Sequence, residues 1–170
     1  MQNAIASSHF PSQRLINTLG FVACAGLLAY AYYLQFYQDL EPCPLCIFQR
    51  VAMFALGVVF LLAALHNPRG GGAKVYGALI FLTAAVGAVI AARHVWIQHL
   101  PTDQIPECGP SLDYLLQSIP FLQVIKTVLR GSGECAEIGW TFLGLSIPEW
   151  TLIAFITMGL VGMIRNWRPT

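Results

Sequence analysis

Two cysteines separated by two residues, Cys43 and Cys46, are the side chains of this sequence best suited to chemistry. The Cys-x-x-Cys spacing is typical of dithiols that exchange disulfides, because the two sulfurs can close a small ring. On a helix that turns about 100° per residue, Cys43, Cys46 and Arg50 fall within about 60° of one another. A helix N-terminus stabilises a thiolate, and so does a nearby guanidinium. The pattern therefore predicts a redox-active pair with Arg50 as its cation.

Two simpler interpretations compete with redox chemistry. Arg50 is expensive to bury in lipid, so its side chain could extend to the membrane surface, but this alone does not explain the face that it shares with the cysteines. The cysteines could also be half of a zinc site, but Cys108 and Cys135 are far apart in the sequence, and a second close pair is missing. The spacing favours redox chemistry, and we expect no metal ligand among these residues.

Cys108 and Cys135 fit a second dithiol. Cys108 is flanked by Pro106, Gly109 and Pro110, in a segment with little helical or strand propensity. Such a segment could move, and thiol–disulfide exchange requires access to the sulfur. A static bridge that staples the segment is equally compatible with the spacing. The presence of the Cys-x-x-Cys pair favours exchange between the two pairs.

Three further residues are weaker candidates. His94 and His99 lie near the end of an apolar run, where a histidine is usually an interfacial residue, although it could donate a hydrogen bond or a proton to a ligand. Cys24 lies in the middle of the first apolar run, where a free cysteine packs like a small apolar side chain. We therefore expect Cys24 to take no part in the chemistry.

The elements that position these residues are predicted to be membrane-spanning helices. The sequence is 56% hydrophobic and 10% charged, whereas soluble domains carry about 25% charged residues. Four apolar runs, at about residues 15–36, 46–65, 75–95 and 148–164, approach the roughly 20 residues that a spanning helix needs. The prediction is an all-α membrane protein, a four-transmembrane-helix bundle that forms a single domain over residues 1–170. The first run is too long for a cleavable signal peptide, and the absence of a basic tract argues against nucleic acid as a partner.

The charges predict how the bundle is oriented. Basic residues precede the first run, join the second to the third and follow the fourth: Arg14, Arg69, Lys74, Arg165 and Arg168. The eight acidic residues lie in or beside the other two connections, at about 37–45 and 96–147. Because cytoplasmic loops are enriched in Lys and Arg, both termini are predicted to be cytoplasmic and these two connections periplasmic. Four of the cysteines then face the compartment in which disulfides persist.

The long second periplasmic connection contains one further predicted helix. Residues 121, 122, 125, 128 and 129 are apolar at helical spacing, residues 123, 126, 127 and 130 form a polar face, and Gly131 is a natural stop. Such a helix could pack on the protein or lie in the membrane interface. The sequence favours neither position.

Two stretches of the sequence resemble one known family. Residues 43–50 read CPLCIFQR, and residues 133–137 read GECAE, followed by WTFLGL at 140–145. Together with the four-span layout, they resemble the disulfide bond formation protein B (DsbB) family over nearly the whole chain. The resemblance implies a multi-pass enzyme of the bacterial cell inner membrane, a protein-disulfide oxidoreductase that reoxidises a DsbA-like periplasmic dithiol protein and reduces a membrane quinone. Ubiquinone is the expected acceptor, and menaquinone is possible.

The resemblance also implies a route for the electrons. The reduced partner would attack a Cys108–Cys135 disulfide at Cys108, and Cys135 would then exchange with Cys43. Cys46, as a thiolate beside Arg50, would react with the quinone ring. His94 matches a family histidine near the quinone, so Cys46, Arg50 and His94 are the expected quinone-binding residues. Gln49 stands where some members have an acid, so no acidic role carries over to it.

The vitamin K epoxide reductase type is the nearest alternative, because it also couples cysteines to quinone in a helical bundle. In that family the Cys-x-x-Cys pair that meets the quinone lies near the last span, whereas here it precedes the second. A membrane protein whose outer cysteines hold a structural zinc ion is the alternative from a different class.

Overall fold

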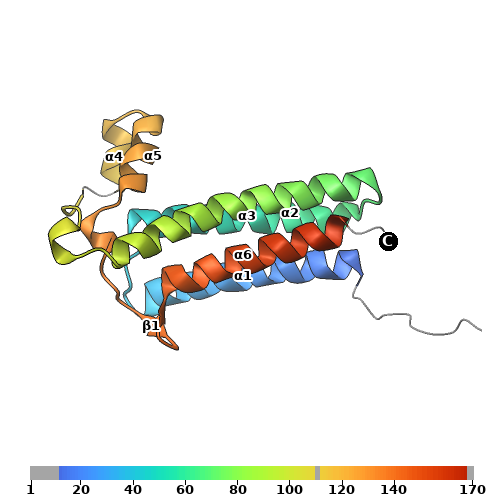
Figure 1. The fold of residues 1–170 in the computed structure, drawn as a ribbon, viewed down its shortest axis with the longest axis horizontal. Helices are drawn as coiled ribbons and strands as arrows, with labels where there is room; N and C mark the ends of the chain where they lie inside the picture. Colours follow the sequence, from blue (N-terminus) through green and yellow to red (C-terminus); the bar gives the residue numbers. More distant parts are fainter. Residues whose placement is uncertain (1–11, 110–111, 168–170) are drawn as a thin grey trace, which may run out of the picture.

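Four long helices form the body of the molecule in this computed structural model, which describes residues 12–109 and 112–167 (Figure 1). They are α1 (Gln13–Tyr37), α2 (Pro44–His66), α3 (Gly71–Gln98) and α6 (Ile147–Trp167). Each is long and apolar enough to cross a membrane, so the predicted four-span helical architecture is confirmed. Pro110, Arg168 and both ends of the chain lie outside the described residues.

The helices extend past the apolar runs from which they were predicted. α3 begins at Gly71 rather than 75 and ends at Gln98 rather than 95. Hydropathy marks the part of a helix suited to lipid, whereas the helix itself continues until its hydrogen-bonding pattern is capped. Asn67 (φ 43°) and Gly70 (φ 60°) reverse the chain within the short turn between α2 and α3. The extension at the end of α3 places His94 about one turn before the end of the helix.

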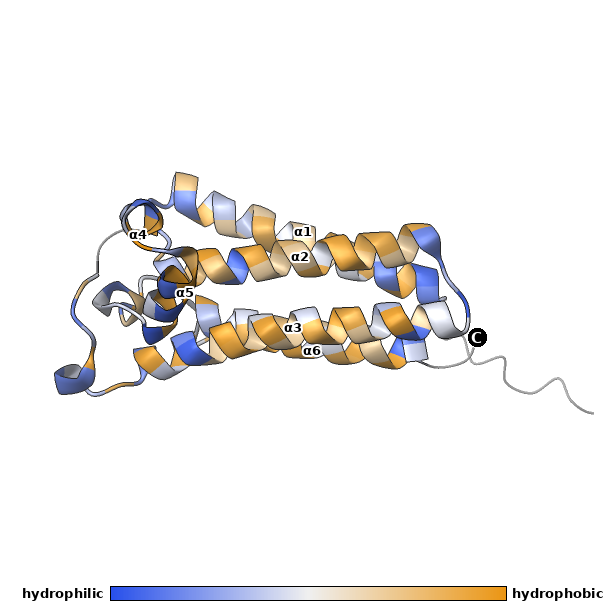
Figure 2. Cartoon of the chain, turned by 90° about the horizontal axis from the view of Figure 1, so that it is seen from above, coloured by the Kyte–Doolittle hydropathy of each residue, from blue (hydrophilic) through white to orange (hydrophobic). Residues whose placement is uncertain are grey.

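Close packing between the helices relies on small residues. α3 packs along α6, α1 along α2, and α2 along α3. A Cβ atom at Gly87 would overlap the ring of Phe155, and one at Gly159 would lie 2.8 Å from the Cβ of Ala84. Small residues let two backbones approach closely, which is how helices associate in lipid. Figure 2 shows apolar residues along the middle of the helices and polar ones gathered toward their ends.

Substitution of Gly87 is expected to destabilise the bundle. The added methyl group in Gly87→Ala would overlap the Phe155 ring, which is fully buried and has little room to move. Overpacking of this kind costs about 1–3 kcal/mol. We expect Gly87→Ala to lower the thermal unfolding temperature in detergent. Gly26→Ala is the matched control, because a Cβ there has no neighbour within 4 Å; equal melting of the two variants would contradict this packing.

A buried amide cluster joins α1 to α6 at the end of the bundle where α2 turns into α3. Asn166 Nδ2 donates to Asn17 Oδ1 at 3.0 Å, and Gln13 Nε2 donates to Asn166 Oδ1 at 2.9 Å. All three side chains are buried, and buried polar groups are stable only when they are paired in this way. The cluster holds the first turn of α1 against the last turn of α6.

The long connection between α3 and α6 folds over the opposite end of the bundle (Figure 1). It contains η1 (Thr102–Gln104), α4 (Leu112–Ser118), α5 (Phe121–Arg130), η2 (Gly133–Cys135), β1 (Thr141–Phe142) and β2 (Leu145–Ser146). The two short strands pair in an antiparallel hairpin. Its two-residue turn, Leu143 (φ 52°) and Gly144 (φ 79°), has the positive φ angles of a tight hairpin. The sequence did not predict this hairpin.

α5 is the helix predicted at 121–130, and it ends at Gly131, whose φ is 85°. Val124 and Val128 are buried, whereas Phe121 and Leu122 remain 68% and 66% exposed. The packed face therefore includes Val124, a position that the helical pattern assigned to neither face. Part of the predicted apolar stripe packs on the protein, and its first two residues form an exposed apolar surface.

Candidate functional site

The Cys43–Cys46 pair lies where the connection from α1 enters α2. Cys43 is the N-cap residue with an extended backbone, and Pro44 occupies the start of the helix, where its missing N–H leaves no bond unmade. Both cysteines are thiols in the structure, and their Sγ atoms lie 3.3 Å apart. A disulfide needs about 2.05 Å, so oxidation of the pair requires only a small movement of the two sulfurs.

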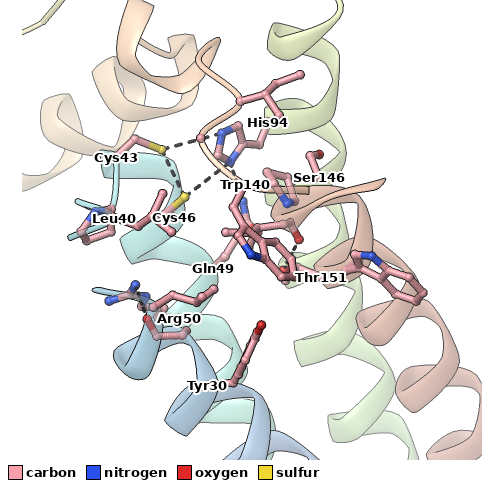
Figure 3. A pocket seen from close by; sticks show the side chains of 18 of the residues that line it. Tyr30, Leu40, Cys43, Cys46, Gln49, Arg50, His94, Trp140, Ser146 and Thr151 are labelled. Atoms are coloured by element: carbon pink, nitrogen blue, oxygen red, sulfur yellow. Dashed lines mark hydrogen bonds between the residues drawn. The ribbon is translucent and has the colours of Figure 1, made fainter. Parts of the chain in front are cut away.

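His94 reaches this dithiol from α3, as Figure 3 shows. Its Nε2 lies 3.7 Å from Cys43 Sγ, and its Nδ1 lies 4.0 Å from Cys46 Sγ. The side chain is only 2% exposed, so the expectation of an interfacial histidine is wrong for His94. The reason is the longer α3, which continues to Gln98 and directs His94 toward α2. His99, after the helix, is exposed and lies outside the site.

Gln49 orients the imidazole ring. Its Nε2 lies 2.9 Å from His94 Nδ1. An amide nitrogen only donates, so Nδ1 is the acceptor and the ring proton lies on Nε2. That proton is donated to the backbone carbonyl of Cys135 at 3.0 Å. From the sequence alone Gln49 had no assigned role, because the resemblance offered only an acidic role at this position. The available signal was the position of Gln49 about one helical turn after Cys46.

Cys135 is brought to the dithiol by the long connection. It is 1% exposed at the end of η2. A hydrogen bond with the Cys43 thiol, together with burial, raises the pKa of the Cys135 thiol. The fully reduced chain therefore holds Cys135 as a neutral thiol beside Cys43. Three of the four predicted cysteines, Cys43, Cys46 and Cys135, therefore lie together, although they come from two separate connections.

Cys108 is the exposed member of the set. The backbone N–H of Gly133 donates to the carbonyl of Glu107 at 3.2 Å. A Cβ atom at Gly133 would lie 3.2 Å from Cys108 Sγ. Cys108 thus lies against Gly133 of η2, the residue two positions before Cys135, and is the sulfur that a soluble protein can reach from outside.

Arg93 fixes the segment that leads to Cys135. Its Nε donates to the carbonyl of Leu129, and its Nη2 donates to the carbonyl of Arg130, both at 3.0 Å. These are unpaired carbonyls of the last turn of α5, which a cation satisfies well. The guanidinium therefore holds the end of α5 against α3. This contact fixes the position of Gly131, where the segment that leads to Cys135 begins.

Arg50 lies one turn beyond Cys46 on α2, and its guanidinium is held by α1. It donates to the side-chain carbonyl of Gln35 and, at 3.2 Å, to the backbone carbonyl of Ala31. It also lies 5.1 Å from the centre of the Tyr32 ring, a distance suited to a cation–π contact. All three partners are neutral, so they position the positive charge without cancelling it. The sequence identified Arg50 but gave no signal for these partners.

A cavity of about 860 Å³ opens beside the dithiol, between α1, α2 and α6. Apolar side chains deep in the spans form most of its wall: Leu27, Leu34, Met53 and Ile153. The polar groups of the site gather at one end: Cys46, Gln49, Arg50 and His94. Ligand pockets typically have volumes of about 300–1,000 Å³ and combine an apolar wall with a few convergent polar groups. This cavity has both properties.

An aromatic group closes the cavity at the hairpin. Trp140 packs edge-on against Tyr30 of α1, with ring centres 6.0 Å apart, and stacks on Phe142 at 6.1 Å. Trp150 of α6 contacts Phe142, and its Nε1 donates to the Phe142 carbonyl at 3.0 Å. The hairpin is thereby fixed to α1 and α6 at once, which the sequence did not predict.

Cys24 lies apart from the site. It is 1% exposed in the apolar core of the bundle, and its Sγ lies 3.8 Å from the sulfur of Met158. This environment agrees with the predicted packing role.

Comparison with known proteins identifies the family to which this arrangement belongs. The sequence profile of the family described as Disulfide bond formation protein DsbB matches residues 13–164. A Disulfide bond formation protein B from Nitrosococcus oceani is 53% identical over 92% of this chain and 93% of its own length. Proteins of the same description from Hahella chejuensis and Xanthomonas axonopodis pv. citri are 55% and 56% identical, over 85% and 88% of this chain and 88% of each relative.

These matches cover almost the whole chain, including both cysteine-bearing connections and all four long helices. They support disulfide bond formation as the activity and a bacterial inner membrane as the location. The chain belongs to the disulfide bond formation protein B family, and it is a multi-pass protein-disulfide oxidoreductase of that membrane.

Proposed function

We propose that the chain reoxidises a DsbA-type periplasmic dithiol protein and passes two electrons through Cys108/Cys135 and Cys43/Cys46 to a membrane quinone. The observation that carries the proposal is the position of the Cys43–Cys46 dithiol between Cys135 on one side and the apolar cavity on the other. A dithiol so placed can exchange with a protein thiol and also meet a lipid-soluble acceptor.

The first half of the route uses the exposed cysteine. A partner thiolate attacks Cys108 Sγ, the Cys108–Cys135 bond breaks, and Cys135 is released. Cys135 then attacks Cys43, so the Cys43–Cys46 bond breaks and Cys46 leaves as a thiolate. The second thiol of the partner releases the oxidised partner from Cys108. The bond from His94 to the Cys135 carbonyl holds that residue over Cys43 during the exchange.

The second half restores the resting disulfides. Cys108 attacks Cys135 in the Cys43–Cys135 disulfide, which re-forms Cys108–Cys135 and leaves Cys43 and Cys46 reduced. A quinone, when bound, supplies an acceptor for two electrons and two protons. Loss of the electron pair from the dithiol re-forms the Cys43–Cys46 bond, and the sum is one disulfide made for one quinone reduced.

The cavity residues fit a quinone. The apolar wall suits a molecule that lives in the bilayer, and the cavity extends from the dithiol into the depth of the spans. Reduction of a quinone builds negative charge on oxygen, and a fixed cation in a site of low polarity stabilises such charge far better than water does. Arg50, held by neutral partners of α1, is placed to do this. Ubiquinone and menaquinone both meet these requirements.

The proposal is tested by steady-state oxidation of a reduced DsbA-type protein by the purified full-length chain in detergent. We expect oxidation only when a quinone is added, with one quinone reduced for each disulfide made. Parallel assays with a short-chain ubiquinone and a short-chain menaquinone identify the preferred acceptor. Oxidation at the same rate without any quinone, under exclusion of oxygen, would contradict the proposed electron acceptor.

The proposed orientation has the dithiol end of the bundle in the periplasm. Exchange with a periplasmic partner requires Cys108 on that side, and the basic turn between α2 and α3 then faces the cytoplasm. A reporter inserted within residues 70–72 is expected to report the cytoplasm, and one inserted near Asp103 is expected to report the periplasm. A periplasmic signal from residues 70–72 would overturn this topology.

A further inference from the structure

Cys43, Cys46 and His94 form a compact set of soft ligands. The two sulfurs lie 3.3 Å apart, and Cys46 Sγ lies 4.0 Å from His94 Nδ1. One ligand atom from each of the three residues lies within 4.8 Å of the other two. In a tetrahedral zinc site with Zn–S of about 2.3 Å and Zn–N of about 2.0–2.1 Å, ligand atoms are roughly 3.5–3.8 Å apart. The three side chains already approximate that spacing.

We propose that the reduced chain binds one Zn²⁺ ion at Cys43, Cys46 and His94, and that this ion blocks reoxidation of the dithiol. Binding replaces two S–H bonds with two Zn–S bonds and releases two protons, without any change of oxidation state. Two thiolates balance the charge of the ion. The disulfide form has no thiolate to offer, so the site exists only in the reduced enzyme.

The surroundings of His94 suit it as a ligand. The bond from Nε2 to the Cys135 carbonyl fixes the ring, as carbonyl groups commonly do for metal-binding histidines. It leaves Nδ1 as the coordinating atom, which would exchange the Gln49 amide for the ion. Cys135, whose thiol bonds to Cys43, is the nearest candidate for a fourth ligand. The sequence lacks a second close pair of cysteines for a zinc site, and His94 from another helix supplies the missing ligand.

The functional consequence is competition between metal and quinone. Reduced dithiol accumulates when quinone is scarce, and an ion held by Cys46 occupies the sulfur that faces the cavity. Zn²⁺ would then inhibit disulfide formation in proportion to the fraction of the enzyme whose Cys43–Cys46 pair is reduced. This inhibition rests on the proposed function, whereas binding of the ion rests on the geometry alone.

Binding is measured first, without partner or quinone. The purified full-length chain, reduced under exclusion of oxygen and freed of reductant, is titrated with Co²⁺, which reports thiolate coordination by its absorption and is displaced by Zn²⁺. We expect one Co²⁺ per reduced chain and none on the oxidised chain. His94→Ala should weaken binding by more than about 100-fold, since loss of an outer partner alone costs roughly 10–100-fold.

Control variants make the outcome decisive. His99→Ala removes an exposed histidine just after α3 and should bind Co²⁺ like the wild type. Cys108→Ala should also retain binding, because Cys108 is outside the ligand set. Cys46→Ser, a nearly isosteric change, removes one of the two thiolates and should strongly weaken the thiolate absorption, a result that is independent of how well His94→Ala folds. Equal Co²⁺ absorption in Cys46→Ser and wild type, or equal uptake by the oxidised and reduced chains, overturns the proposal.

Inhibition is measured second, in the quinone-dependent oxidation assay. We expect Zn²⁺ to slow turnover, and the inhibition to weaken as quinone concentration rises. Undiminished turnover at Zn²⁺ concentrations that saturate the reduced chain overturns the inhibitory role. A chain that shows no turnover even in metal-free buffer contradicts the proposed function instead, and the Co²⁺ result then still decides whether the metal site exists.

Discussion

Replacing Cys46 with alanine is expected to abolish quinone-dependent turnover while leaving capture of the thiol partner intact. Cys46 lines the cavity, whereas Cys108 is exposed in a different connection. In Cys46→Ala the partner can still attack Cys108, but no dithiol remains beside the cavity. Loss of a residue that reacts covalently lowers turnover by at least about 100-fold. Partner oxidation with excess quinone, and trapping of the mixed disulfide on a non-reducing gel, measure the two effects.

Cys108→Ala is expected to show the opposite separation. The partner is no longer trapped, while quinone still reoxidises a chemically reduced Cys43–Cys46 pair. Cys24→Ala is the matched control, because Cys24 is a buried thiol packed in the core of the bundle, and it should turn over like the wild type. An inactive Cys24→Ala together with an active Cys46→Ala would show that the electron route is wrong.

The architecture could be predicted because lipid imposes it locally. A run of about 20 apolar residues has few alternatives to a spanning helix, and each of the four runs lies within a long helix of the structure. The cysteines were identified for a similar reason, since two residues three positions apart at a helix start must lie together. The connection that carries Cys135 was harder, because its fold depends on contacts such as those of Arg93 with the end of α5.

The contacts that complete the site join distant parts of the sequence. His94 lies 51 positions after Cys43, and Arg50 lies 15 positions after Gln35. No periodicity within one helix specifies which faces of two helices meet, so the burial of His94 and the partners of Arg50 required the structure. The hairpin was not predicted because its turn places Leu143 at a positive φ, which residues other than glycine rarely adopt.

The cavity also depends on tertiary arrangement. α1 and α6 are joined by the Asn17–Asn166 amide cluster at one end. At the other end, the aromatic contacts of Trp140 with Tyr30 and of Phe142 with Trp150 bridge them through the hairpin. The space between these two attachments is where the cavity lies. Composition predicts that the helices are apolar, but only their relative placement creates a site.

Replacing Arg50 with methionine is expected to raise the quinone requirement, with kcat/KM for quinone about 100-fold lower, since a fixed donor to a developing oxyanion contributes roughly 10²–10³ to the rate. Arg50→Lys keeps the charge but can serve only one of the two acceptors, Gln35 and the Ala31 carbonyl, because an ammonium lacks the planar fork. Its defect should be intermediate. Steady-state partner oxidation over a range of quinone concentrations measures all three proteins.

Partner capture separates an effect on quinone from a general loss of structure. Trapping of the partner at Cys108 should be unchanged in both Arg50 variants, because Cys108 lies in a separate connection and the Arg50 guanidinium is held by residues of α1. Arg69→Met removes an exposed cation in the turn at the other end of the bundle and should leave quinone dependence unaltered. If Arg50→Met requires no more quinone than the wild type does, the guanidinium only anchors α2 to α1 near the membrane surface. The negative charge on the reduced quinone would then have to be stabilised by other groups at the polar end of the cavity, such as the Gln49 amide or the His94 ring, whose Nδ1 lies 4.0 Å from Cys46 Sγ.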